Sequence, residues 1–298
     1  MYECDHYWDS LHKEEPGGFS AVGYAALGEG FNREAYRRLR LPALRRILHR
    51  NRVVARSLLE AGVGTGAYGP VWHELDVKRW VGLDISPHAI ADLRHRFPNG
   101  EFHLADIARP QIALEEKAFD LVTAIDVLYH IVDDAHFETA LRWLSTRVAE
   151  RGRLLVSDVF TEAPHGRRFA HVRRRPMEAY LGILEPLGLR LVDREAVFAI
   201  LGDPVPDRDG RGSLLFSAWR VLQKSIRMMP RRVRNTYGKT IVRSLAPIDR
   251  LIRATTDVRG LNLELAMFAP KDSALNRSLK YGQNSKPVYR TRFPGQFF

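Results

Sequence analysis

The segment from Glu60 to Gly66 holds the residues best suited to ligand chemistry, and it reads EAGVGTG. It follows an apolar run and precedes a helical pattern, so it occupies a strand-to-helix turn. Glycines at such a turn let the backbone approach a nucleotide ligand closely. The spacing from Gly64 to Gly69 also fits the G-x-G-x-x-G pattern of dinucleotide-binding proteins. The glycines alone therefore leave the class of nucleotide open.

Three acidic residues at the ends of three successive predicted strands narrow that choice. Glu60 ends the first strand, where an acid would repel a pyrophosphate but would suit the ammonium and sulfonium groups of S-adenosylmethionine. Asp84 ends the second, where a carboxylate can accept hydrogen bonds from ribose hydroxyls in either class. Asp106 follows the third, where a carboxylate can accept from the adenine amino group. Together the acids favour S-adenosylmethionine over NAD.

Across about residues 53 to 160 the chain resembles the class I S-adenosylmethionine-dependent methyltransferases. The glycine turn, the strand-end acids and the segment FDLVTAIDVLYH at 119–130 occur in the family's order, with glutamate where aspartate is commoner. The resemblance implies that S-adenosylmethionine is the cofactor, with its methionine part at the glycine turn, its ribose at the second acid and its adenine at the third. The implied cofactor-binding residues are Glu60, Ala61, Gly62, Gly64, Gly66, Asp84, Ile85, Asp106, Ile107, Ile125 and Asp126.

Histidines near the predicted carboxyl edge of the sheet are the catalytic candidates. His130 follows the fourth strand, where it can act as a general base or only orient the loop. His165 and His171, on the basic loop after the fifth strand, are further candidates. Asp126 and Asp158 end adjacent strands, but the Asp-Asn pair expected of a metal-dependent catechol enzyme is missing. We therefore predict no metal.

The alternation of short apolar runs with amphipathic segments from Val53 to Phe160 predicts βαβ units in a parallel sheet. The expected strands are Val54–Glu60, Trp80–Ile85, Glu101–Ala105, Phe119–Ala124, Arg153–Val159, Arg190–Ile200 and Asn262–Phe268. The expected helices are Asn32–Arg50, Pro70–Asp76, Pro87–Phe97 (capped by Ser86), Ala135–Val148, Pro176–Leu187, Leu214–Met229 and Lys239–Ala254.

The predicted fold is α/β, a doubly wound Rossmann-like sheet with an N-terminal helical appendage and a helical insertion before the last strand. The resemblance implies seven strands with the last one antiparallel. The predicted organisation is an N-terminal helical segment (1–50), a cofactor-binding core (51–201), a helical insertion (202–257), the last core strand (258–271) and a polar tail (272–298). We expect the insertion to act as a lid that, with Tyr7 and Trp8, closes over the methyl group and excludes water.

The 298 residues carry a net charge of +11 and a single cysteine, Cys4. One cysteine allows no internal disulfide, and no segment is long and apolar enough to span a membrane, so we expect a cytoplasmic protein. The basic charge suits nucleic acid, an anionic membrane surface or an acidic small molecule, and charge alone does not choose among these partners. The oligomeric state is not evident from the sequence.

The expected function is methylation of a small-molecule acceptor, on oxygen, with a saccharide or specialised metabolite as the acceptor. One alternative is an RNA or protein methyltransferase, supported by the charge and by the run RRVR at 231–234. Against it, the Asn/Asp-Pro-Pro-Tyr/Phe signature of base amino-group methylation is absent after the fourth strand. A second alternative is a protein that binds the cofactor without turnover, although the intact glycine and acid set argues against it.

Overall fold

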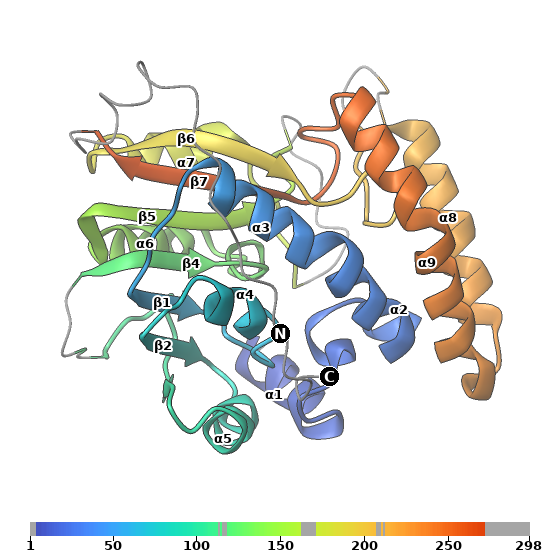
Figure 1. The fold of residues 1–298 in the computed structure, drawn as a ribbon, viewed down its shortest axis with the longest axis horizontal. Helices are drawn as coiled ribbons and strands as arrows, with labels where there is room; N and C mark the ends of the chain where they lie inside the picture. Colours follow the sequence, from blue (N-terminus) through green and yellow to red (C-terminus); the bar gives the residue numbers. More distant parts are fainter. Residues whose placement is uncertain are drawn as a thin grey trace.

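One seven-stranded sheet runs through the computed structural model, which describes residues 4–112, 114, 118–161, 171–206, 210 and 212–271 (Figure 1). Its order is β3-β2-β1-β4-β5-β7-β6, and β7 pairs antiparallel with both of its neighbours. The predicted doubly wound sheet with an antiparallel last strand is confirmed. The strands are β1 (Ser57–Ala61), β2 (Arg79–Asp84), β3 (Glu101–Leu104), β4 (Phe119–Ala124), β5 (Val148–Asp158), β6 (Leu189–Ala196) and β7 (Glu264–Pro270).

Helices cover both faces of the sheet, as its nearly continuous apolar strands require. One face packs against α3 (Leu41–Arg50) and α4 (Gly69–Glu74), and the other against α6 (Asp134–Ser145) and α7 (Met177–Leu184). Next to β3 lies α5 (Pro87–Arg96). The predicted cap of this helix is confirmed, because Ser86 Oγ accepts a hydrogen bond from the Ala89 N–H.

Two strands are shorter than the apolar pattern predicts. β1 begins at Ser57, and Val54 before it is 79% exposed. β6 ends at Ala196, and the Val197 N–H still donates to the Leu263 carbonyl oxygen at 2.9 Å, just before β7. Farther along, the N–H groups of Ala199 and Leu201 each lie 3.0 Å from Asp249 Oδ2. A carboxylate from the insertion thus binds the loop that follows this strand.

The N-terminal segment is helical nearly throughout. The predicted helix at Asn32–Arg50 is observed as α2 (Glu29–Ala35), a π-helical turn η3 (Tyr36–Arg40) and α3 in unbroken succession. A further helix, α1 (Cys4–Glu14), and two short turns, η1 (Phe19–Val22) and η2 (Ala25–Leu27), precede it. The sequence had indicated only an aromatic opening there.

The insertion between β6 and β7 is a pair of helices, α8 (Ser213–Met228) and α9 (Arg231–Thr255). α9 begins earlier than the predicted Lys239, because Gly238 does not break it. This glycine lies where α9 packs on α2, and a Cβ there would be 3.0 Å from the Phe31 Cβ. Figure 1 shows α8 and α9 beside α2. Residues 4–50 and 213–255 thus form one body, called the cap below. No helix among the described residues has the length and apolar character needed to cross a membrane.

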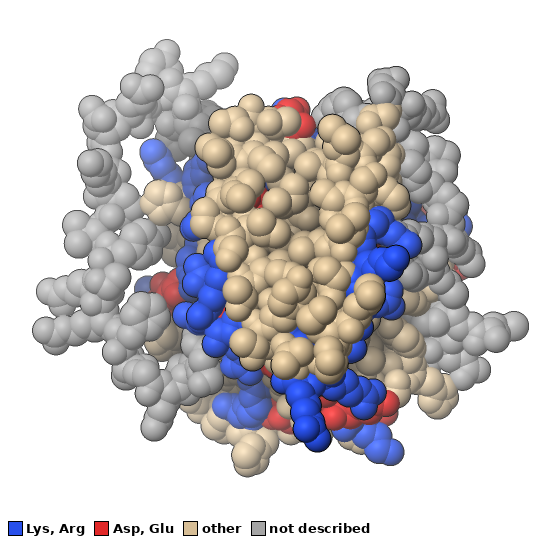
Figure 2. Space-filling view, turned by 90° about the vertical axis from the view of Figure 1, so that its right-hand side faces the viewer, with Lys and Arg blue, Asp and Glu red and all other residues tan. Residues whose placement is uncertain are grey.

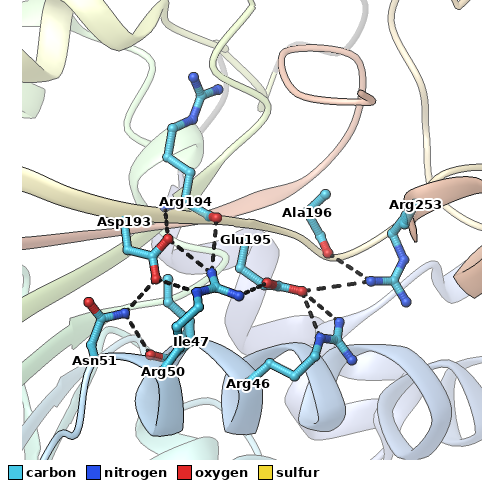
Figure 3. Close-up of polar contacts among 9 residues, drawn as sticks. All are labelled: Arg46, Ile47, Arg50, Asn51, Asp193, Arg194, Glu195, Ala196 and Arg253. Carbon is cyan, nitrogen blue, oxygen red and sulfur yellow. Dashed lines mark hydrogen bonds and ion pairs between the residues drawn. The ribbon is translucent and has the colours of Figure 1, made fainter. Parts of the chain in front are cut away.

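Ion pairs join the cap to the edge strand β6 (Figure 3). On α3, Arg50 Nε lies 2.7 Å from Asp193 Oδ2, and Arg46 Nε lies 2.8 Å from Glu195 Oε1. Arg253 of α9 reaches the same Glu195 carboxylate, with a nitrogen–oxygen distance of 3.8 Å. Both parts of the cap are therefore fixed to the same strand, although they lie about two hundred residues apart in the sequence.

Candidate active site

A cavity of about 670 Å³ lies between the cap and the carboxyl ends of the parallel strands. This is the edge where open α/β sheets bind ligands, and the volume is within the about 300–1,000 Å³ typical of small-molecule sites. Residues that follow β1 to β5 line one side, and residues of α1, η2, η3 and α8 line the other. The first set is called the strand side below, and the second the cap side.

The glycine turn forms part of the strand side with its backbone. Gly62 and Gly64 line the cavity with φ angles of 68° and 53°, in the left-handed region that favours glycine. A Cβ on Gly62 would lie 2.1 Å from Val127 Cγ2, so a larger residue cannot fit there. The Gly62 N–H donates to the Leu83 carbonyl oxygen at 2.7 Å, which ties the turn to β2.

Two of the predicted strand-end acids line the same cavity. Asp84 is nearly buried, and its Oδ2 accepts from the Gly64 N–H at 2.8 Å while its Oδ1 accepts from the Ser86 N–H at 3.0 Å. These bonds fix the carboxylate beside the glycine turn. Asp106 is exposed and lines the cavity next to the buried side chain of Ile107.

Glu60 lies near the end of β1, as predicted, but its surroundings differ from the expected ligand-facing ones. It does not line the cavity, and it is buried behind the turn, where its Oε2 accepts from the indole N–H groups of Trp72 and Trp80 at 2.8 and 2.9 Å. Burial raises its pKa to about 8. A carboxyl that is mostly protonated at neutral pH is a poor partner for an ammonium group. Glu60 instead holds two tryptophans behind the turn.

The predicted site residues as a whole divide into three groups. Those that line the cavity are Gly62, Gly64, Asp84, Ile85, Asp106, Ile107, Ile125, Asp126 and His130. Besides Glu60, those that do not line it are Ala61, which is fully buried in β1, and Gly66, where a Cβ would be 2.8 Å from the Phe97 ring. His165 lies outside the described residues.

Asp126 is held by contacts that span the strand side and the cap side. It pairs with Arg40 of η3, and Tyr68 Oη donates to the same carboxylate oxygen at 3.3 Å. Tyr129 Oη donates to the other oxygen at 3.1 Å. The backbone of Asp126 has a φ of 63°, unusual for a residue other than glycine, and its N–H donates to Ser157 Oγ at 2.7 Å. This cluster fixes the loop after β4 against the cap.

His130 lines the cavity, is partly buried and faces aromatic rings. Its ring lies 4.6 Å from the Trp8 ring of α1 and 4.4 Å from that of Tyr129. Its Nδ1 is 2.8 Å from the His171 carbonyl oxygen, and a carbonyl can only accept, so Nδ1 carries the proton and Nε2 the lone pair. Burial lowers the His130 pKa to about 4. The ring is neutral at pH 7.

The cavity is lined by paired and unpaired cations from the loop after β5 and from α8. Arg174 pairs with Asp203 at 2.8 Å, and the Trp219 indole donates to the same carboxyl group at 3.1 Å. Arg220 and Arg227 of α8 also line the cavity, and within the part of the chain that the structure describes the guanidinium group of neither forms an ion pair or hydrogen bond. With Gln223, these arginines stand at i, i+3 and i+7, so one helical face turns toward the cavity.

Sequence reasoning missed Arg40 and the α8 residues Arg220, Gln223 and Arg227. The i, i+3, i+7 spacing was a usable signal for the α8 set, because it adjoins the apolar face formed by Trp219, Leu222 and Ile226. Arg40 gave no signal, since its partner lies in a distant segment.

The described residues contain no group of three His, Cys, Asp or Glu side chains that would hold a metal ion. Asp158, named above in weighing a metal site, is fully buried and does not line the cavity. Its Oδ2 accepts from Tyr180 Oη at 2.8 Å, and burial raises its pKa to about 6. Its carboxyl group therefore has a structural partner of its own.

Comparison with known proteins identifies a methyltransferase domain within the chain. Residues 58–152 match the family model described as "Methyltransferase domain", and no curated protein sequence matches the chain. A putative sarcosine dimethylglycine methyltransferase from Galdieria sulphuraria is 14% identical, covers 91% of this chain and 98% of its own, and has a TM-score of 0.54. A putative methyltransferase in complex with the Haloferax volcanii Trm112 activator is 13% identical, with the same coverages and a TM-score of 0.53.

The N-methyltransferase NodS from Bradyrhizobium japonicum, in complex with S-adenosyl-L-homocysteine, is 27% identical over 55% of this chain and 78% of its own, with a TM-score of 0.44. The two higher TM-scores concern the fold alone. The family match covers β1 to the start of β5, and within it lie the glycine turn and the acids that follow β2 and β3. The match identifies residues 58–152 as a methyltransferase domain, in agreement with the resemblance to the class I S-adenosylmethionine-dependent methyltransferases, and it supports S-adenosylmethionine as the cofactor.

Proposed function

We propose that this methyltransferase acts on a hydroxyl oxygen of a small acceptor that also carries an anionic group, such as a sugar acid or an acidic specialised metabolite. The observation that carries the proposal is the extent of one cavity. It reaches from the glycine turn and Asp84 on the strand side to Arg220 and Arg227 on the cap side.

The strand side fits the cofactor. Gly62 and Gly64 expose backbone that a Cβ would block, the Asp84 carboxylate is held beside them, and Asp106 with Ile107 lies farther along the wall. These residues, with Ile85 and Ile125, would hold S-adenosylmethionine. The bound cofactor supplies a methyl group on a positively charged sulfur, which is a good leaving group.

Helix α1 closes the cavity over the strand side. Asp9 Oδ1 accepts from Ser86 Oγ at 2.7 Å and contacts His88 Nδ1 at 2.8 Å, so α1 is docked on the start of α5. This docking brings Tyr7 and Trp8 to the cavity wall. Their rings exclude water, and aromatic faces attract a nearby cation such as a sulfonium.

His130 is the proposed proton acceptor. Its Nδ1–H is committed to the His171 carbonyl, so Nε2 is the ring atom able to accept the proton of a hydroxyl acceptor. A pKa of about 4 makes His130 a weak base, but it also ensures that the ring is unprotonated across the physiological range. Alignment of the two substrates supplies much of the remaining acceleration.

Arg220 and Arg227 are the proposed binding groups for the anionic part of the acceptor. The other two arginines at the cavity are already neutralised, Arg40 by Asp126 and Arg174 by Asp203. Unpaired guanidinium groups favour carboxylate or phosphate ligands, which they bind with two parallel hydrogen bonds. The cap also covers the cavity, which favours a small acceptor over a macromolecule.

The test uses methyl transfer from labelled S-adenosylmethionine to a panel of hydroxylated small molecules. The panel contains carboxylated or phosphorylated members, their neutral counterparts and RNA. We expect transfer to an anionic member, with the methyl group on oxygen by mass spectrometry. In that reaction Arg220→Ala and Arg227→Ala should each raise the KM for the acceptor about tenfold. Lys224→Ala, on the same helix but away from the cavity, should not. Transfer to RNA or to a neutral acceptor only would contradict the proposal.

A further inference from the structure

The α8–α9 hairpin (residues 213–255) carries most of the excess charge of the chain. It has ten Lys and Arg residues and one acid, Asp249, which is fully buried. Eight of the ten cations are exposed, so the hairpin surface is basic and has no exposed acid. The exposed cations are Arg220, Lys224, Arg227, Arg231, Arg232, Lys239, Arg243 and Arg250, of which Arg220 and Arg227 also line the cavity and Arg243 pairs with Glu34.

Large apolar side chains lie exposed among these cations. On α8, Leu214, Val221 and Met228 are spaced seven residues apart, and they are 86%, 71% and 70% exposed. On α9, Val233, Ile248 and Leu251 are exposed as well. These six make up most of the exposed large apolar residues in the described part of the chain; the others are Val54, Leu104 and Leu187.

The spacing on α8 places its three residues on one stripe, separate from the face that lines the cavity. Figure 2 looks onto this side of the molecule and shows a broad area of uncharged side chains with Lys and Arg along its edges. The buried faces of the two helices are already used. Trp219, Ile226 and Val242 belong to the hydrophobic core, and Asp249 accepts backbone N–H groups of the loop after β6. The exposed apolar stripe therefore is not needed to hold the hairpin in place.

We propose that the outer face of the α8–α9 hairpin docks on an anionic membrane surface. Apolar side chains flanked by cations are the pattern of helices that lie in the membrane interface, where acyl chains take up the apolar groups and anionic headgroups attract the cations. Nucleic acid would use the cations but would leave Leu214, Val221 and Met228 exposed to water. The occupant that matches both features is a bilayer rich in acidic phospholipid.

Co-sedimentation with lipid vesicles tests the proposal on the full chain. One set of vesicles is phosphatidylcholine alone, and in the other about a third of the lipid is phosphatidylglycerol. We expect binding to the second set, weakened by added salt because surface attraction is screened. A fluorescently labelled RNA is titrated in parallel.

Two pairs of variants separate the apolar and the electrostatic contributions. Leu214→Ser/Val221→Ser should lower partitioning at least about tenfold, while Val54→Ser, a comparably exposed valine before the interior strand β1, should not. Lys224→Glu/Arg231→Glu should lower it about 25-fold, about fivefold for each cation removed. Arg52→Glu/Arg151→Glu, with the same charge change at exposed sites before β1 and in β5, should have a smaller effect.

All substituted side chains are exposed, so thermal unfolding should remain unchanged and reports whether the fold is kept. Equal binding to neutral and anionic vesicles would overturn the proposal. The proposal would also be overturned if the hairpin variants bound anionic vesicles as well as their control variants do. Tight binding of RNA without binding of vesicles would overturn it too.

Discussion

The strand side and the cap side of the cavity are built in different ways. On the strand side, residues lie close to their partners in the sequence or follow adjacent strands, as when Asp84 accepts from Gly64 and Ser86. On the cap side, contacts join segments about two hundred residues apart, as when Arg243 of α9 pairs with Glu34 of α2. The strand side is thus a local construction, and the cap side depends on the assembly of the whole chain.

Because the cap depends on contacts between distant segments, shortening a side chain at its buried centre should destabilise the protein. Trp219 is fully buried, packs against Tyr24 and Phe31, and donates to Asp203. Trp219→Ala should lower the free energy of unfolding by about 3–5 kcal/mol, since it leaves a large cavity and removes a buried hydrogen bond to the Asp203 carboxylate. Urea denaturation followed by circular dichroism measures this loss.

Val221→Ala, two residues farther along the same helix but exposed, should change stability by less than about 0.5 kcal/mol. If Trp219→Ala lowered the free energy of unfolding no more than Val221→Ala does, the cap would not be part of the cooperative fold. The same packing implies that replacing residues 203–256 by a short turn would expose Phe31 and Leu27. Point variants are therefore the better probes of the predicted lid.

The second prediction concerns the buried Glu60 behind the glycine turn. Its pKa is raised from 4.5 to about 8, so its contribution to stability is complete below pH 4.5 and is lost as the pH rises to about 8. Between pH 6 and 8, the free energy of unfolding of the wild-type protein should fall by about 2–3 kcal/mol more than that of Glu60→Gln. This window lies above the raised pKa values of Asp158 and Glu264, both about 6. Identical pH profiles of thermal unfolding would show that Glu60 is already ionised in the folded protein.

The third prediction concerns His130, where the strand side meets the cap side. His130→Ala should lower turnover about a hundredfold and leave cofactor affinity nearly unchanged. Wild-type activity should fall only as the pH drops through about 4, because protonation removes the base. His171→Ala is the control, since His130 bonds to the backbone of residue 171. Equal rates in the two variants would assign His130 a purely structural role.

The sequence was most informative where the contacts are local. The parallel strands, the Ser86 cap and the place of Asp84 follow from apolar runs and turn residues that act within one βαβ unit. Glu60 was expected to face the ligand and its burial was not foreseen, because Trp72 of α4 and Trp80 of β2 reach it only after both elements pack beside β1. A motif shows which residue is present but not which neighbours bury it.

The cap was predictable as helices but not as a single body. Amphipathic spacing indicated α8 and most of α9, yet no local pattern indicates that α2 packs on α9 or that Arg40 pairs with Asp126, 86 positions away. Such pairs are chosen by the packing of the whole chain. Which residues form the cap side of the cavity was therefore visible only in the structure.

Calorimetric titration of S-adenosylmethionine tests the division of the cavity most directly. Asp84→Ala should weaken binding by about 1.5–3 kcal/mol, because a charge-assisted hydrogen-bond partner is lost from the strand side. The double variant Arg220→Ala/Arg227→Ala should bind S-adenosylmethionine as wild type does, because both arginines lie on the cap side, where we propose that the acceptor binds. Wild-type affinity in Asp84→Ala together with loss of affinity in the double arginine variant would contradict the account, since it would place the cofactor against the cap.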